Sequence, residues 1–464
     1  MQKNKLTQLL AILSRREMTR FKEFAFSPYF NKHEDIQMLV AYLSDVYPNF
    51  NTEQCDREVI FQALFPNEPH DQSRLALIFT YTMRLLESFL IQEQHQENEY
   101  AQQLLLLKAF RLKKQYHHYE KTLQSVNKQR KNITLKDDFY YHWHYQLAAE
   151  ADTYYNQMQR RQTDHNIQYK QNNLDQFYLL EKIKDACEMH MRRRILNVDY
   201  STRMLEAVQR ELHDNEAEYI REPLILLYYQ IYQMLTQEDT NFYFTAFQTL
   251  QRYEHSFTKS ELHNIYNYFQ NYCIQRINRG EGRFMEEIFK LYKAQLKQGL
   301  LFEDDHLSEW HFKNIVTVAI RLNEMTWVKD FIEQYKAKLP PEAQENAYRF
   351  NMASYHYAMQ EYDKVLQLLL KVEYSDLRYS LGARALLLRT YYDLEEYEAL
   401  ISLVQSFTLY LRRNKLMADS NREGHQNLFK FTRRAAQLRA KLGYEHDDKL
   451  QKQLNKLKED VNSA

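Results

Sequence analysis

One pattern of apolar positions occurs three times between Ile315 and Leu411, at a constant spacing of 35 residues. Within each copy it predicts two amphipathic helices joined by a short polar turn. A helix pair of this kind buries its apolar stripe only by stacking on neighbours, so the pattern predicts an α-solenoid. We expect the repeated positions to form its structural core: Trp327, Tyr362 and Tyr397; Phe331, Leu366 and Ile401; and Leu322, Tyr357 and Tyr392.

The remainder of the chain is also patterned as helices, but without this strict spacing. Residues 1–95 hold four of the seven prolines and predict a helical N-terminal head, in which Thr52 and Asp71 are expected N-caps. Residues 96–425 predict the solenoid of antiparallel helix pairs, most regular over 311–411, with Pro223 opening one helix. Residues 426–464 predict polar-faced helices that cap the array.

Composition supports an all-α fold. The 464 residues include only 6 Gly and 7 Pro, whereas sheets with tight turns and nucleotide-binding loops both consume glycine. Tyrosine is abundant at 37 residues. In a helical protein we expect those rings to fill the grooves between helices and to keep their hydroxyls in water.

Two segments resemble known families. Met352-Ala353-Ser354-Tyr355-His356-Tyr357, followed by Glu361-Tyr362-Asp363-Lys364 and a leucine-rich helix, resembles a degenerate tetratricopeptide repeat, and Glu395-Glu396-Tyr397-Glu398 repeats its turn. Val365 and Leu400 stand where that family usually has alanine, so no peptide-pocket residue is carried over. Phe26-Ser27-Pro28-Tyr29-Phe30-Asn31, with Leu64-Phe65-Pro66, resembles uncharacterised helical proteins of Bacteroidota, which implies no activity.

The charge balance and the cysteine spacing further limit the functional classes to which the protein can belong. The 62 basic and 62 acidic residues balance, which excludes a generally basic nucleic-acid binder. Cys55, Cys187 and Cys273 match no metal or redox spacing and predict reduced thiols. The apolar stretch near the N-terminus is too short for a signal peptide, and no run approaches the roughly 20 apolar residues that cross a bilayer. We therefore expect a cytoplasmic protein without membrane insertion.

No catalytic or metal-binding set emerges from the sequence. His142 and His144 would diverge by about 200° on a helix, so they cannot chelate together, and we expect the histidines at the surface. Nucleophile-elbow, phosphate-loop and dinucleotide motifs are absent. Gly280-Glu281-Gly282 is better explained as a turn between paired helices. We therefore expect no metal, no cofactor and no enzymatic activity.

The remaining choice lies between a protein scaffold and a nucleic-acid binder. Arg192, Arg193 and Arg194 are the candidate polyanion contacts, but basic clusters near helix C-termini are explained by the helix dipole. The acidic residues Asp137-Asp138, Glu150 and Asp152 lie among the basic clusters of this half of the chain. They should therefore interrupt any continuous basic stripe on the surface. A period of 35 also matches pentatricopeptide repeats, although three copies are too few for an RNA code. We predict a scaffold that binds a protein or peptide on its concave face; a nucleic-acid-associated regulator is the alternative.

Overall fold

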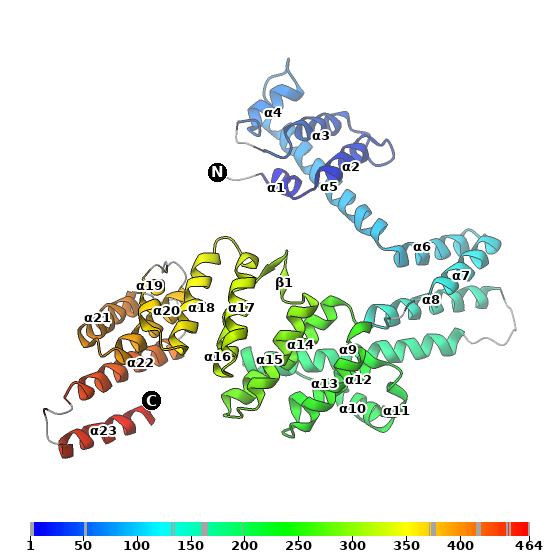
Figure 1. Ribbon diagram of the computed structural model, residues 1–464. Helices are drawn as coiled ribbons and strands as arrows, with labels where there is room; N and C mark the ends of the chain where they lie inside the picture. The colour runs from blue at the N-terminus through cyan, green and yellow to red at the C-terminus, as the bar shows by residue number, and fades with distance from the viewer. Residues whose placement is uncertain are drawn as a thin grey trace. The chain divides into compact units, whose positions relative to one another are not determined.

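The protein is built from α-helices, as the computed structural model shows (Figure 1). The structure describes residues 4–50, 53–130, 133, 135–158, 166–196, 198–370, 372, 377–413, 419–441, 444 and 447–462. Within these ranges it has 23 α-helices and one short hairpin of two strands, β1 (Phe302–Glu303) and β2 (His306–Leu307). The predicted all-α class is confirmed.

The chain forms two compact units, Met1–Lys184 and Asp185–Ala464. The helices of the first unit are α1 (Lys5–Ala11), α2 (Arg15–Phe26), α3 (Glu34–Val46), α4 (Arg57–Leu64), α5 (Gln72–Glu97), α6 (Glu99–Leu112), α7 (Tyr116–Arg130) and α8 (Asp138–Gln157). Helix α9 (Asn166–Leu196) runs across the division. The first unit contains the predicted head and the start of the predicted solenoid; the boundaries near residues 95 and 425 remain predictions.

Helices α1 to α5 share one hydrophobic core, with buried side chains from Leu6 to Phe89. Side-chain caps set where these helices begin. Asp71 Oδ1 accepts from the amides of Ser73 (2.8 Å) and Arg74 (3.0 Å), so the cap predicted there is confirmed. Helix α4 begins later than predicted, because Asp56 rather than Thr52 caps it; Thr52 lies outside the described residues.

A short loop after α2 is held by Asn31, which is buried. Its Nδ2 donates to the backbone oxygen of Ala25 (2.8 Å), and its Oδ1 accepts from the amide of His33 (3.0 Å). In the loop that these bonds hold, Tyr29 is exposed and Phe30 stacks on Phe24. Helix α2 ends at Phe26, with Ser27 as its C-cap, because Pro28 cannot continue the helix.

Helices α6, α7 and α8 form a second cluster around Tyr119 and Tyr154, whose rings stack at 3.9 Å. Beside it, Arg111 forms a two-point ion pair with Glu150: Nε to Oε1 is 2.5 Å and Nη2 to Oε2 is 3.0 Å. Both side chains are almost fully buried, at 10% and 5% exposure. A buried charge needs such a partner, so the pair fixes α6 against α8.

The second unit consists mainly of helix hairpins. Its helices are α10 (Leu205–Asp214), α11 (Glu216–Tyr219), α12 (Pro223–Thr236), α13 (Asn241–Tyr253), α14 (Lys259–Asn278), α15 (Phe284–Gln298), α16 (Glu309–Arg321), α17 (Met325–Tyr335), α18 (Gln344–Ala358), α19 (Tyr362–Leu369), α20 (Leu377–Asp393), α21 (Tyr397–Arg413), α22 (Asp419–Arg439) and α23 (Asp447–Asn462). Pro223 opens α12, as predicted. Each even-numbered helix from α12 to α20 packs on the helix that follows it.

The turns within the last four of these hairpins share one backbone conformation. After the first helix of each pair comes a residue with positive φ, and the next amide donates to the carbonyl five positions back, the Schellman arrangement. The positive-φ residues are Gly280, Asn323, Gln360 and Glu395. The predicted turn at Gly280-Glu281-Gly282 is therefore confirmed.

These turns give the true period of the repeat. Asn323 and Gln360 are 37 residues apart, and Gln360 and Glu395 are 35 apart. The predicted constant spacing of 35 therefore holds for the last interval and is two residues short for the one before. As a result, Trp327 is the third residue of α17, whereas Tyr362 is the first of α19.

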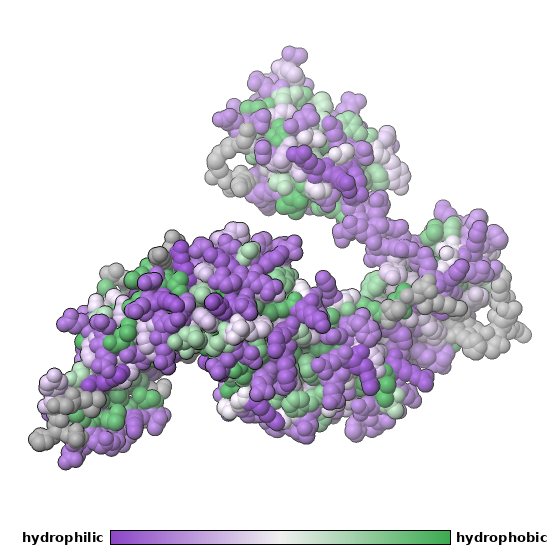
Figure 2. Space-filling model, in the orientation of Figure 1, coloured by the Kyte–Doolittle hydropathy of each residue, from purple (hydrophilic) through white to green (hydrophobic). Residues whose placement is uncertain are grey.

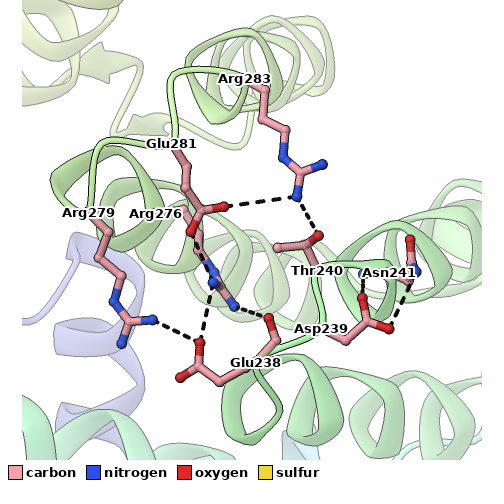
Figure 3. Close-up of polar contacts among 8 residues, drawn as sticks. All are labelled: Glu238, Asp239, Thr240, Asn241, Arg276, Arg279, Glu281 and Arg283. Carbon is pink, nitrogen blue, oxygen red and sulfur yellow. Dashed lines mark hydrogen bonds and ion pairs between the residues drawn. The ribbon is translucent and has the colours of Figure 1, made fainter.

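The turns of the hairpins α12–α13 and α14–α15 are joined by a polar cluster (Figure 3). Arg276 is buried and donates from Nη2 to the backbone oxygen of Glu238 (2.9 Å) and from Nη1 to Glu281 Oε1 (3.0 Å). Arg279 Nη1 lies 3.1 Å from Glu238 Oε2. Since a buried guanidinium requires these acceptors, the cluster holds the two turns in one relative position.

Tyrosines fill the space between the hairpins of this region. Tyr228, Tyr243 and Tyr266 are fully buried. Tyr228 donates its hydroxyl to Glu261, and Tyr266 donates to Glu254 Oε2 at 3.2 Å. Burial, and then the nearby carboxylates, raise the pKa of both phenols. The expectation that tyrosine hydroxyls stay in water is wrong here, because carboxylates replace the water.

Candidate functional site

A groove near the C-terminus of the chain is one of several concave sites among the described residues, and we take it as the candidate site because its lining is mainly apolar. It has a volume of about 370 Å³, and we call it the C-terminal groove. Helix α18 packs on α20, α20 on α22 and α22 on α23. The lining residues are Tyr357 of α18; Arg389, Tyr392 and Asp393 of α20; Leu428, Phe431, Thr432 and Ala435 of α22; and Leu457 and Val461 of α23.

Most of this lining is apolar or aromatic, with Arg389 and Asp393 as its charged side chains. Figure 2 shows apolar side chains at this end of the chain within a largely polar surface. A mainly apolar concave site with a few placed polar groups is typical of binding sites. None of the ten lining residues is a serine, cysteine or histidine.

A hydrogen bond fixes the α18 side of the groove to α20. The Tyr357 hydroxyl donates to Asp393 Oδ2 at 2.6 Å. Burial, followed by this hydrogen bond, raises the pKa of Tyr357, so the phenol stays protonated and remains a donor. Because Asp393 is the last residue of α20, the contact sets how far this helix end lies from α18.

Helix α22 is attached to α20 and α21 by several contacts. Arg439 donates to the backbone oxygen of Tyr392 (3.3 Å) and pairs with Glu395 (2.6 Å), while its guanidinium lies 5.4 Å from the Tyr392 ring. Ten residues earlier on α22, Phe429 stacks on Phe407 of α21 at 3.8 Å. These contacts make the floor of the groove a fixed surface.

Helix α23 packs on α22. Leu450 and Leu457 are buried at 7% and 6% exposure, whereas Leu454 and Val461 are exposed at 37% and 48%. Arg434 of α22 lies 2.5 Å from Asp460 and lowers its pKa. A helix of 16 residues is marginal in water by itself, and two buried leucines stabilise by roughly 3–6 kcal/mol. Packing on α22 therefore holds α23 in the fold.

The predicted repeat-core residues divide into buried and half-buried positions. Phe331 is buried, and Trp327 packs against Phe289 of the preceding hairpin at 4.9 Å. The half-buried members are Leu322, Trp327, Tyr357, Tyr362, Leu366, Tyr392, Tyr397 and Ile401. Fully buried instead are Val328, Val365 and Leu400. Tyr357 and Tyr392 line the C-terminal groove, so they lie where a ligand would bind.

The candidate polyanion contacts already have acidic neighbours. Arg192 Nε lies 2.5 Å from Glu188 Oε1, and Arg193 Nη2 lies 3.0 Å from Asp199 Oδ1. The side chain of Arg194 lies outside the described residues. Glu150 was predicted to interrupt a basic stripe, and in the structure its carboxylate forms an ion pair with Arg111. Whether these arginines contact a polyanion remains a prediction.

The two histidines of α8 occupy different environments. His142 is exposed and stacks on Phe177, whereas His144 is fully buried and donates from Nδ1 to the backbone oxygen of Tyr140 (2.7 Å). Burial lowers the pKa of His144 from 6.5 to about 4. The expectation of surface histidines is wrong for His144, because its ring fills the α8 core. Among the described residues, no group of three or more His, Cys, Asp or Glu could hold a metal ion.

Comparison with protein-family models, with curated proteins and with solved structures gives no match for this chain. Helix α5 is long and apolar enough, by length and composition, to cross a membrane. Its apolar residues Leu75, Ile78, Leu86 and Phe89 form part of the core of the head. A function can therefore be inferred only from the surfaces of the chain itself.

Sequence reasoning missed the groove itself. It treated residues 426–464 as a cap and Tyr357 and Tyr392 as core. The available signal was the seven-residue spacing of Leu450 and Leu457, which places both on one face of a polar helix. That signal shows an apolar stripe but not the surface against which it packs.

Proposed function

We propose that this protein is a non-catalytic interaction scaffold, an α-solenoid of helix pairs that binds a protein or peptide partner in the C-terminal groove. The observation that carries the proposal is that Tyr357, Tyr392 and Phe431, from three successive first helices, line one groove. A surface shared by successive repeats is the surface that helical-repeat proteins offer to a partner. The groove is lined mainly by apolar and aromatic side chains, which fits the binding of a protein or peptide.

The order of helix contacts supports the solenoid. Helix α16 packs on α18, α18 on α20 and α20 on α22, while α17, α19 and α21 each lie between consecutive members of this series. Each turn has the same Schellman geometry. Repetition of one turn and one neighbour relationship is how stacked helix pairs build an extended binding surface. A degenerate tetratricopeptide-like array is thus the architecture we propose.

A nucleic-acid partner has less support. Arg111, Arg192 and Arg193 each pair with a carboxylate, so they offer phosphates less free positive charge than their sequence clusters suggest. The lining of the C-terminal groove holds one basic residue, Arg389, and one acidic residue, Asp393. Such a surface lacks the excess positive charge that backbone phosphates require.

Affinity capture from cells of the native host, with the full-length chain as bait, tests the proposal. The groove variant is Phe431→Asp, and the matched control is Leu409→Asp, an exposed apolar position on α21 outside the groove. We expect proteins that are retained by the wild type and by Leu409→Asp, and lost with Phe431→Asp. Circular dichroism confirms that both variants are folded. A set of captured proteins that is identical for all three baits would contradict the proposal.

A further inference from the structure

We infer that a pocket between helices α7, α8 and α9 binds a small carboxylic acid with an apolar body, and that Arg130 holds its carboxylate. The pocket has a volume of about 230 Å³, and we call it the Arg130 pocket. It lies within the first compact unit and shares no lining residue with the C-terminal groove. The inference is therefore independent of the proposed function.

The floor of the Arg130 pocket is apolar. It consists of Leu123 of α7 and of Leu147, Ala148 and Ala151 of α8. All four side chains are buried, with at most 7% exposure. The two alanines are three residues apart and so lie on one face of α8, where their small side chains leave space. Covering this floor with an apolar group removes more of its surface from water, which is favourable.

The rest of the lining is polar or aromatic: Asn127, Arg130, Tyr155 and Tyr169. The guanidinium of Arg130 lies over the Tyr169 ring, with Cζ 4.6 Å from the ring centroid. In the part of the chain that the structure describes, the side chains of Asn127, Arg130 and Tyr155 make no hydrogen bond or ion pair. Arg111 of the same unit is, by contrast, already paired with a carboxylate. Three polar groups at the pocket can therefore bond to a ligand.

The charge of the lining selects the class of ligand. Arg130 is the one charged residue among the described lining residues. A guanidinium binds a carboxylate through two parallel hydrogen bonds, and a single cation matches a single negative charge. An α-amino acid is disfavoured, because its ammonium group would be buried without an acidic partner.

The size of the pocket limits the ligand further. Its volume of about 230 Å³ is below the roughly 300–1,000 Å³ of pockets that hold drug-sized molecules. The apolar floor and the nearby tyrosine rings suit one aromatic ring or a short branched chain. We therefore assign the pocket to monocarboxylic acids of that size.

Contacts outside the pocket hold its three helices in position. The Tyr154 hydroxyl of α8 donates to Glu120 of α7 at 3.0 Å. On α9, Lys170 follows Tyr169 directly and forms an ion pair with Asp152 of α8 at 3.0 Å. The walls are thus fixed before a ligand arrives, which reduces the entropy that binding costs.

Isothermal titration calorimetry with the full-length chain tests the inference. The probes are 3-phenylpropionate, benzoate and 4-methylpentanoate, and we expect the best of them to bind with a Kd below about 1 mM. The neutral analogue 3-phenylpropanamide should bind at least tenfold more weakly than 3-phenylpropionate. Phenylalanine, which adds an ammonium group, and inorganic phosphate, which lacks an apolar body, should also bind at least tenfold more weakly.

Substitution of Arg130 places the binding at this pocket. Arg130→Gln should weaken 3-phenylpropionate at least tenfold and abolish the preference for the acid over its amide, whereas Arg130→Lys should retain part of that preference. The preference is a ratio measured on one protein, so it does not depend on a change in stability. Lys128→Gln, at an exposed position of the same helix, is the matched control and should leave both values unchanged.

The inference is overturned if none of the three acids saturates the wild type by about 10 mM, or if Arg130→Gln and Lys128→Gln bind equally well. Equal affinity for phenylalanine or phosphate would refute the ligand class. N-acetylphenylalanine represents the C-terminus of a peptide, and tighter binding of this compound than of 3-phenylpropionate would refute the assignment to a free acid. The C-terminal groove is tested separately, through Phe431→Asp.

Discussion

Tyr357 donates a hydrogen bond of 2.6 Å to Asp393, which lies 36 residues further along the chain. The bond joins the last turn of α18 to the last residue of α20. Both residues line the C-terminal groove. The shape of the groove therefore depends on a contact between two successive repeats, and this contact can be removed by deleting a single oxygen atom.

Replacement of Tyr357 by phenylalanine should lower the free energy of unfolding by about 1–3 kcal/mol, since it leaves the Asp393 carboxylate without this donor. Urea denaturation followed by circular dichroism measures the change. The control is Tyr355→Phe, on the same helix, for which the described contacts include no hydrogen bond of the hydroxyl. Equal stability of the two variants would show that the bond does not hold α18 to α20.

Stability should fall in acid through His144. The unfolded chain binds a proton at this residue with a pKa near 6.5, whereas the folded protein binds it only near pH 4. The stabilising effect of neutral His144 is thus complete above pH 6.5 and is lost as the pH falls from 6.5 to 4, by about 3 kcal/mol. His144→Leu should flatten this slope whatever its stability at pH 7. Trp143, studied in a Trp310→Phe, Trp327→Phe background, reports unfolding of this region. A slope unchanged by His144→Leu would contradict the assignment.

The turn after α14 should need glycine at one of its two glycine positions. Gly280 has φ +89° and Gly282 does not have positive φ, while an added Cβ would meet nothing within 4 Å at either site. Gly280→Ala should therefore destabilise the protein by about 1–2 kcal/mol through backbone strain alone. Gly282→Ala is the matched control and should be close to neutral. Thermal unfolding distinguishes them, and equal losses would point to the loop sequence rather than its conformation.

The buried ion pair of Arg111 and Glu150 should be sensitive to loss of one partner. Glu150→Gln removes the charge that compensates a nearly buried guanidinium and should destabilise by about 3–5 kcal/mol. Arg192→Gln breaks the exposed pair with Glu188 and should leave unfolding unchanged. Chemical denaturation of both variants provides the measurement. A small effect of Glu150→Gln would mean that water reaches Arg111.

Nucleic-acid binding should be weak and should vanish by about 0.15 M salt, where screening acts over about 8 Å. Fluorescence anisotropy with single-stranded RNA and duplex DNA across a salt series tests this. Submicromolar affinity at physiological salt, abolished when Arg192, Arg193 and Arg194 are changed to glutamate, would replace the scaffold by the nucleic-acid alternative.

The sequence predicted local features well where a single side chain decides them. Asp71 caps α5 and Pro223 opens α12 because hydrogen bonding at a helix start depends on residues a few positions away. The 35-residue spacing was right between Gln360 and Glu395 but two residues short between Asn323 and Gln360. The apolar pattern of a helix can be aligned with a two-residue error, because apolar residues flank the stripe on both sides. Both alignments then place apolar residues at nearly all of the repeated positions.

The periodic pattern of apolar residues could not predict the candidate site. Tyr392 belongs to the apolar stripe of α20, yet whether its ring lies in a core or a groove depends on Arg439, 47 residues later. Likewise, His144 looked like a surface residue because nothing in its local sequence reveals that α8 is covered on that side. Burial of a polar ring is decided by packing between distant segments, which one sequence does not show.

The buried tyrosines between the hairpins give the protein an optical property. Tyr228, Tyr243 and Tyr266 keep their protons well above pH 10, and burial raises the pKa of Tyr292 to about 12. In the unfolded chain the same phenols ionise near pH 10, so alkali pulls the equilibrium toward unfolding. Phenolate absorbance should therefore rise in two phases, an immediate one from exposed rings and a slow one that follows the opening of the helix stack. Ultraviolet absorbance alone therefore measures the rate at which the helix stack of this chain unfolds in alkali.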